Sequence, residues 1–212
     1  MLLAMDIGNT NVKIGIFKGE ELAYTWRVST VASHTADEYG MVIYDLLRQG
    51  GHSFDDIDGA VMSSVAPSLN YTIEHMCSYY TGRKPLTVDY RTKTGIEVRY
   101  DNPSELGADR MVGAAAAYRF YGGPVIEVDF GSATTFNLVT AEGRFIGGAI
   151  APGVKTAAES LVNTAAKLPR VELSLPESIV GTSTRSCMQA GLIYGYTGLS
   201  SIWCPNTAHC PR

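Results

Sequence analysis

An aspartate followed by glycine and small polar residues occurs twice in this sequence, each time directly after an apolar run. The first copy is Asp6-Ile7-Gly8-Asn9-Thr10-Asn11, and the second is Asp129-Phe130-Gly131-Ser132-Ala133-Thr134. Glycine lets the backbone approach a ligand, and the N–H groups of such a turn can donate to phosphate oxygens. An aspartate at the end of a strand can also hold a hydrated Mg²⁺. One copy is equally compatible with an ordinary hairpin, but two copies favour a nucleotide phosphate site.

A third acidic position, Asp109, lies in the stretch Y-D-N-P-S-E-L-G-A-D-R at 100–110. Its Asn-Pro pair must bend the chain, because the residue before proline avoids the helical region. Ser104 can then cap a helix that runs through 111–120 and contains Asp109 and Arg110. The residues alone leave open whether Asp109 and Arg110 contact a ligand or form a solvated ion pair on a helix face.

The elements that must position these residues alternate along the chain. Each turn lies between two strand-like runs, and a third such run follows at 21–30 and at 144–151. Further strands are predicted at 57–65 and 86–88, and further helices at 35–49, 70–81, 155–166 and 182–199. This order suits mixed sheets flanked by helices. The repeated three-strand unit indicates a duplicated α/β fold that brackets one nucleotide between its halves.

Composition excludes several classes of function. The net charge of −4 and the lack of a Lys/Arg-rich stripe give no reason to expect nucleic-acid binding. No apolar run is long enough to cross a membrane and no basic leader precedes the first strand, so we expect a cytoplasmic protein with no membrane contact. The four cysteines lack C-x-x-C spacing and the four histidines are scattered, so no zinc site is expected.

The motifs together resemble one family, type III pantothenate kinase. They are D-I-G-N-T-N-V-K at 6–13, Y-D-N-P-S-E-L-G-A-D-R at 100–110, V-D-F-G-S-A-T-T at 128–135, G-G-A-I-A-P-G at 147–153, K-L-P-R-V-E-L at 167–173 and M-Q-A-G-L-I-Y-G-Y at 188–196. The resemblance covers residues 1 to about 199, and the 100–110 block is its most specific part. It implies duplicated actin-like (ribonuclease H-like) lobes, each a mixed sheet flanked by helices, at 1–118 and 119–212.

The activity implied by the resemblance is ATP-dependent phosphorylation of pantothenate to 4'-phosphopantothenate, the first step of coenzyme A biosynthesis, by a homodimer. Asp109 would be the general base, Asp6 would lie near Mg²⁺, and Asp129 would bind K⁺ or NH₄⁺. The implied ATP contacts are Asp6, Ile7, Gly8, Asn9, Thr10, Asn11, Val12, Lys13 and Ser132. The implied pantothenate contacts are Tyr100, Gly107, Ala108, Asp109, Arg110 and Thr184.

The second half of the chain is expected to be incomplete. Compared with the first half, it lacks a later strand–helix–strand portion, and residues 200–212, S-S-I-W-C-P-N-T-A-H-C-P-R, are expected to form an atypical tail without helical or strand periodicity. Two alternatives to an active kinase therefore stay open at this point. The chain could be a non-catalytic regulatory relative that binds a nucleotide or metabolite, or an inactive truncated kinase.

Overall fold

The computed structural model describes residues 1–203, which divide into two compact units. The first unit comprises residues 1–94 and 100–112, and the second comprises residues 95–99 and those from 113 onward. Each unit is described by itself. In the part of the chain that the structure describes, no helix is both long and apolar enough to cross a bilayer.

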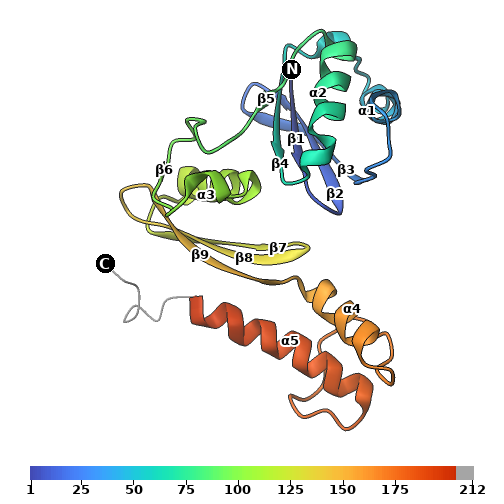
Figure 1. The fold of residues 1–212 in the computed structure, drawn as a ribbon, viewed down its shortest axis with the longest axis vertical. Coiled ribbons are helices and arrows are strands. Elements are labelled where there is room, and N and C mark those ends of the chain that lie inside the picture. Colours follow the sequence, from blue (N-terminus) through green and yellow to red (C-terminus); the bar gives the residue numbers. More distant parts are fainter. Residues whose placement is uncertain (204–212) are drawn as a thin grey trace. The chain divides into compact units, whose positions relative to one another are not determined.

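The first unit contains a five-stranded mixed sheet with the strand order β3-β2-β1-β4-β5 (Figure 1). The strands are β1 (Leu2–Ile7), β2 (Asn11–Lys18), β3 (Glu21–Ser29), β4 (Gly59–Ser64) and β5 (Leu86–Thr87). The helices are α1 (Ala36–Gln49) and α2 (Pro67–Thr81), with a short 3-10 turn at Phe54–Asp56. The central strand β1 pairs antiparallel with β2 and parallel with β4.

Alternating burial along β1 separates the two faces of this sheet. Leu3, Met5 and Ile7 are at most 4% exposed and pack in the core with α1 and α2, whereas Ala4 and Asp6 face the other side. The predicted start of α1 is confirmed, since Thr35 and Glu38 form a complete capping box. The aspartate is thus held on a rigid strand, on the face opposite the helices of the core.

The second unit contains a four-stranded mixed sheet with the order β6-β9-β8-β7 (Figure 1). The strands are β6 (Glu97–Val98), β7 (Val125–Phe130), β8 (Ala133–Val139) and β9 (Arg144–Pro152), and the helices are α3 (Ala108–Tyr121), α4 (Val154–Thr164) and α5 (Thr184–Trp203). The boundary between the units falls within α3. Two mixed sheets flanked by helices confirm the predicted α/β class.

The repeated element is an antiparallel meander, β1-β2-β3 in the first unit and β7-β8-β9 in the second. In the first sheet β1 is central, because β4 pairs with its other edge. In the second sheet β7 is an edge strand, and among the described residues it has no counterpart of β4 beside it. Val128 and Phe130 on this strand are 36% and 58% exposed.

Several boundaries differ from those predicted, including those of three helices. Helix α2 begins at Pro67, three residues early, because proline suits the first position of a helix. Helix α3 begins at Ala108 without Ser104 as its cap, since Ser104 lies in a 3-10 turn and its hydroxyl donates to the Asn102 side chain. Helix α5 continues through Trp203, whose ring stacks on Phe136. The rest of the predicted tail, 204–212, lies outside the described residues.

Candidate active site

Asp6 and Lys13 form an ion pair at the end of the first hairpin. They are directly opposite each other in the β1–β2 register, and Lys13 Nζ lies 3.2 Å from Asp6 Oδ2. The side chains are 33% and 49% exposed, respectively, so both can reach a ligand. The other carboxylate oxygen, Oδ1, is buried and has no hydrogen-bond partner among the described residues. A buried carboxylate oxygen in this state is suited to a further donor or a cation.

The turn between β1 and β2 is held by its own backbone and by the end of β3. The Gly8 N–H donates to the Asn11 carbonyl at 3.0 Å, and a Cβ on residue 8 would lie 3.1 Å from that oxygen, which explains the glycine. Thr30 donates from its hydroxyl to the Gly8 carbonyl at 2.7 Å and from its N–H to the Thr10 carbonyl at 3.0 Å. Asn9 and Thr10 stay exposed. Thr30 was not predicted as a site residue, and its one signal in the sequence is its position directly after the third strand.

A cavity of about 300 Å³ lies beside Asp6 on the face of the sheet opposite the core helices. Its polar lining residues are Asp6, Lys13, Thr25 and Ser63, and the others are apolar or glycine. Ser63 is only 6% exposed, and its Oγ has no hydrogen-bond partner among the described residues. Ser63 was not predicted as a site residue either, because a serine near the end of a buried strand belongs to no motif.

Asp109 lies in the first turn of α3, at the end of the sheet where β1 and β4 finish. The preceding Gly107 packs near Val65, since a Cβ on residue 107 would lie 3.6 Å from Val65 Cγ1. Val65 directly follows β4, and its N–H donates to the Ile7 carbonyl at the end of β1 at 3.0 Å. The structure therefore brings Asp109 to the same end of the sheet as Asp6, within the first unit.

Arg110 is a buried cation beside an aromatic ring. It is 8% exposed, and its guanidinium carbon lies 5.9 Å from the centroid of the Tyr100 ring. Its backbone N–H donates to Asp109 Oδ1 at 2.7 Å, which orients the carboxylate. A buried guanidinium next to a ring offers a planar, desolvated site for a carboxylate.

The second Asp-x-Gly turn connects β7 and β8 and is braced in a similar way. The Ser132 carbonyl accepts from the Gly153 N–H at 2.9 Å and from the Thr156 hydroxyl at 2.8 Å. Asp129 is exposed, and its Oδ2 lies 3.5 Å from where a Cβ on residue 131 would be. In both units, the turn is thus held by residues that follow the third strand of the meander.

Thr184 is the first residue of α5 and is exposed. Ser183 precedes it, and the Ser183 hydroxyl accepts from the Ser186 N–H at 3.2 Å, as a helix cap does. Thr184, Asp129 and Ser132 lie in the second unit, whereas the other predicted site residues lie in the first.

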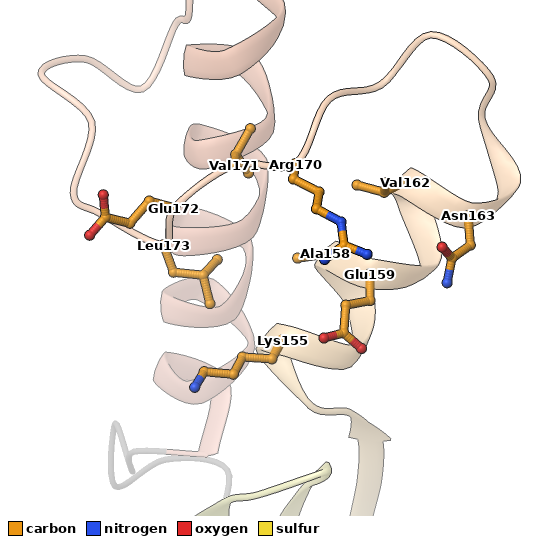
Figure 2. Close-up of a pocket in the computed structure, with 9 residues that line it drawn as sticks. All are labelled: Lys155, Ala158, Glu159, Val162, Asn163, Arg170, Val171, Glu172 and Leu173. Carbon is orange, nitrogen blue, oxygen red and sulfur yellow. The ribbon is translucent and has the colours of Figure 1, made fainter.

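A larger cavity, of about 590 Å³, lies in the second unit between α4 and residues 170–173. Figure 2 shows Lys155 and Glu159 on α4 and Arg170 on the facing loop. None of the predicted site residues lines this cavity. The larger cavity is therefore not where the predicted site residues lie, and the acidic residues with their Asp-x-Gly turn identify the candidate site better than cavity volume does.

Among the described residues no group of three or more His, Cys, Asp or Glu could hold a metal ion, so a cation at Asp6 would depend on phosphate oxygens and water for its other ligands.

Comparison with known proteins gives a consistent result along the whole described chain. A family model described as type III pantothenate kinase matches residues 2–203. The type III pantothenate kinase of Geobacillus kaustophilus (strain HTA426) is 48% identical over 198 residues, which cover 93% of this chain and 77% of that protein. The protein of the same name from Syntrophotalea carbinolica is 48% identical over 199 residues, covering 94% and 78%.

Solved structures of low sequence identity share the fold. One described as a Baf family transcriptional activator from Campylobacter jejuni has a TM-score of 0.59 at 18% identity and covers 94% of this chain and 78% of that one. One described as a 2-dehydro-3-deoxygalactonokinase from Sinorhizobium meliloti has a TM-score of 0.56 at 9% identity, covering 97% and 82%. At these identities the likeness establishes the fold alone.

Proposed function

This chain belongs to the type III pantothenate kinase family, and from that premise we propose which of its residues transfer a phosphoryl group from ATP to pantothenate. The product is 4'-phosphopantothenate, the first intermediate on the route to coenzyme A. The observation that carries the residue assignment is the position of Asp109, in a helix turn beside Val65 at the end of the sheet where Asp6 also lies. We keep residues 1–118 and 119–212 as the functional halves in this proposal.

Asp109 is the general base of the reaction in this proposal. Its carboxylate takes the proton of the primary alcohol as the alcohol oxygen attacks the γ-phosphorus, while the bond to the ADP oxygen breaks. Phosphoryl transfer passes through a loose transition state, so the base mainly orients the alcohol and removes the proton late. The hydrogen bond from the Arg110 N–H to Asp109 Oδ1 supports this role, because it holds the carboxylate in one orientation.

The first hairpin binds the phosphate groups of ATP. The turn from Gly8 to Asn11 supplies N–H groups and side-chain donors, and Lys13 supplies a positive charge at the same end of the hairpin. Mg²⁺ fits at Asp6 through one of its bound waters, since Asp6 Oδ1 is buried without a partner among the described residues and Mg²⁺ usually keeps several waters next to substrate phosphates. When bound, the ion would neutralise charge on the transferred phosphoryl group.

Arg110 and Tyr100 recognise the other substrate. Pantothenate carries a carboxylate, and the buried guanidinium beside the Tyr100 ring is suited to bind it in a bidentate way. Gly107 and Ala108 precede the base without bulky side chains, which leaves room for the alcohol. Thr184 adds a hydroxyl at the start of α5.

Asp129 binds a monovalent cation, K⁺ or NH₄⁺, and Ser132 contacts ATP in this proposal. An exposed carboxylate on a tight turn supports an ion of low charge density, which keeps much of its hydration. We expect turnover to collapse when Na⁺ replaces K⁺ and to return when K⁺ is added back. Asp129→Asn should remove this difference between the two ions. Equal rates of the unaltered chain in both salts would contradict the assignment.

The homodimer expected of this family would use α5. Gly191, Gly195 and Gly198 recur at a spacing that puts them on one side of the helix. Among the described residues, and apart from the helix's own nearby backbone, a Cβ at each would meet no atom within 4 Å. Such a smooth side supports close approach of a second helix. Gly195→Leu should convert dimer to monomer in light scattering coupled to gel filtration, and an unchanged mass would contradict this interface. We place the enzyme in the cytoplasm, as suits an ATP-dependent metabolic kinase.

The direct test of the function is phosphorylation of pantothenate with ATP, followed by detection of ADP and of the phosphorylated product. Asp109→Asn preserves the side-chain volume and should lower kcat by roughly 10²- to 10⁴-fold. The matched control is Asp101→Asn, an exposed aspartate eight positions earlier, which should leave kcat unchanged. Near-normal turnover by Asp109→Asn would show that Asp109 has a structural role only. ATP binding without any turnover by the unaltered chain would instead favour a binding protein.

A further inference from the structure

Ser63 is a buried hydroxyl that the proposed mechanism does not use. It lies on β4 in the central part of the first sheet and is 6% exposed. Its Oγ has no hydrogen-bond partner among the described residues, although it lines the cavity beside Asp6. A buried hydroxyl without a partner loses the hydrogen bonds it would make in water, which is unfavourable. Such a group is expected to have a polar partner when the site is occupied.

The position of Ser63 indicates which partner that is. In the parallel pairing of β1 with β4, Ser63 is the register partner of Asp6, so the two side chains leave the sheet on the same face. Asp6 Oδ1 is the other buried side-chain oxygen without a partner in this cavity. Neighbouring strands lie about 4.8 Å apart. When one oxygen makes hydrogen bonds to two groups, the bonded atoms of those two groups are separated by roughly 5 Å, which is close to the strand spacing. One polar atom can therefore satisfy both side chains at once.

We propose that Ser63 is a positioning residue of the nucleotide site, where Ser63 Oγ and Asp6 Oδ1 hold the same water of a hydrated Mg²⁺. This inference rests on the proposed function, because it takes the Mg²⁺·nucleotide to be the ligand at Asp6. In this arrangement, Lys13 bonds Oδ2 of Asp6 at 3.2 Å and Ser63 fixes the water at Oδ1, so both carboxylate oxygens are oriented. Ser63 acts through the water and Asp6, and does not touch the reacting atoms.

The test measures binding, using a non-hydrolysable ATP analogue and calorimetric titration at increasing Mg²⁺ concentrations. Ser63→Ala should raise the Mg²⁺ concentration needed for half-maximal analogue binding roughly three- to tenfold, as expected for the loss of one buried hydrogen bond. Ser63→Thr keeps the hydroxyl and suits a strand, so it should restore most of the Mg²⁺ affinity. The matched control is Ser64→Ala on the same strand, because Ser64 Oγ already accepts from the Ala66 N–H and should not affect Mg²⁺.

Stability separates this role from a purely structural one. Since Ser63 Oγ makes no hydrogen bond among the described residues, Ser63→Ala should leave the denaturation midpoint unchanged or raise it, while more Mg²⁺ is needed for half-maximal analogue binding. A lower midpoint with unchanged Mg²⁺ dependence would overturn the proposal. Equal weakening of analogue binding with Mg²⁺ and in EDTA would place Ser63 on the nucleotide itself, and would also overturn it.

Asp6→Asn distinguishes failure of this inference from failure of the proposed function. If Asp6→Asn shifts the Mg²⁺ dependence and Ser63→Ala does not, the cation site stands and the role of Ser63 is refuted. If neither substitution shifts it, the assignment of Mg²⁺ to Asp6 is itself wrong.

Discussion

Substitution of Gly107 by alanine should displace Asp109, the proposed catalytic base, without unfolding the protein. A Cβ on residue 107 would lie 2.6 Å from Asp109 Oδ1 but 3.6 Å from Val65 Cγ1, which is an ordinary contact. The backbone at Gly107 needs no left-handed conformation, so the methyl group conflicts only with the end of a movable side chain. The Asp109 carboxylate must therefore rotate away, and it then loses the 2.7 Å hydrogen bond from the Arg110 N–H.

The size of the effect follows from the size of the displacement. Moving Oδ1 from 2.6 Å to the 3.4 Å at which ordinary contacts begin is a shift of about 0.8 Å. A misplacement near 1 Å can cost about 10²-fold in rate, which corresponds to about 2.7 kcal/mol of transition-state stabilisation. The free energy of unfolding should change by less than about 1 kcal/mol, because alanine also restricts the unfolded chain. Steady-state kinetics with varied pantothenate, together with urea denaturation, measure both quantities.

A double-mutant cycle makes this prediction strict. If Gly107→Ala acts only by moving Asp109, then Gly107→Ala should have little further effect in the Asp109→Asn background. The control is Gly59→Ala at the start of β4, where the new Cβ would meet Leu2 Cδ1 at an ordinary 3.6 Å. Full turnover by Gly107→Ala, or rate losses that multiply in the double variant, would refute the argument.

Three further predictions concern other parts of the chain. Thr30→Val removes the bond to the Gly8 carbonyl, so nucleotide affinity should fall several-fold and stability by about 1 kcal/mol, as titration and denaturation would detect. Phe130→Lys puts a charge on the exposed edge strand β7. It should reduce association of chains through this sheet edge, as measured by light scattering, and leave the denaturation midpoint unchanged. Burial, with a smaller contribution from the Glu74 charge, raises the pKa of the Cys77 thiol to about 12. Iodoacetamide at pH 8 should therefore label the exposed Cys187 and leave Cys77 unmodified until the protein is denatured, as peptide maps would detect.

Local signals in the sequence were sufficient where neighbouring residues decide the structure. The capping box of Thr35 and Glu38 needs residues only three positions apart, and both of its hydrogen bonds are present. The first Asp-x-Gly turn is likewise local, since Gly8 bonds to Asn11. These elements were predicted because propensity and hydrogen bonding act there within a single turn of the chain.

The groups that brace the site could not be found in this way, because their partners are distant in the sequence. Thr30 bonds to Gly8, 22 positions away, and Thr156 bonds to Ser132, 24 positions away. Ser63 meets Asp6 only through the parallel pairing of β1 with β4. Serine and threonine occur throughout the chain, so nothing in the sequence distinguishes these three residues. Only the register of the sheets identifies them as part of the site.

The two copies of the turn also show why a repeated motif does not give a repeated environment. β1 and β7 both read as apolar strands ending in aspartate, and both begin an antiparallel meander. Every second residue of β1 is buried in the core with α1 and α2, and β4 pairs with its second edge, whereas β7 lies at the edge of its sheet and ends in three exposed residues. Burial of a strand depends on which strands pair with it, and that pairing is decided by segments remote from the motif. Asp6 consequently has a neighbour on both sides, Lys13 on β2, with which it forms an ion pair, and Ser63 on β4, while Asp129 is exposed beside a single neighbouring strand. This difference suits the proposed roles, in which the carboxylate of the first unit orients a divalent cation and that of the second retains a hydrated monovalent ion.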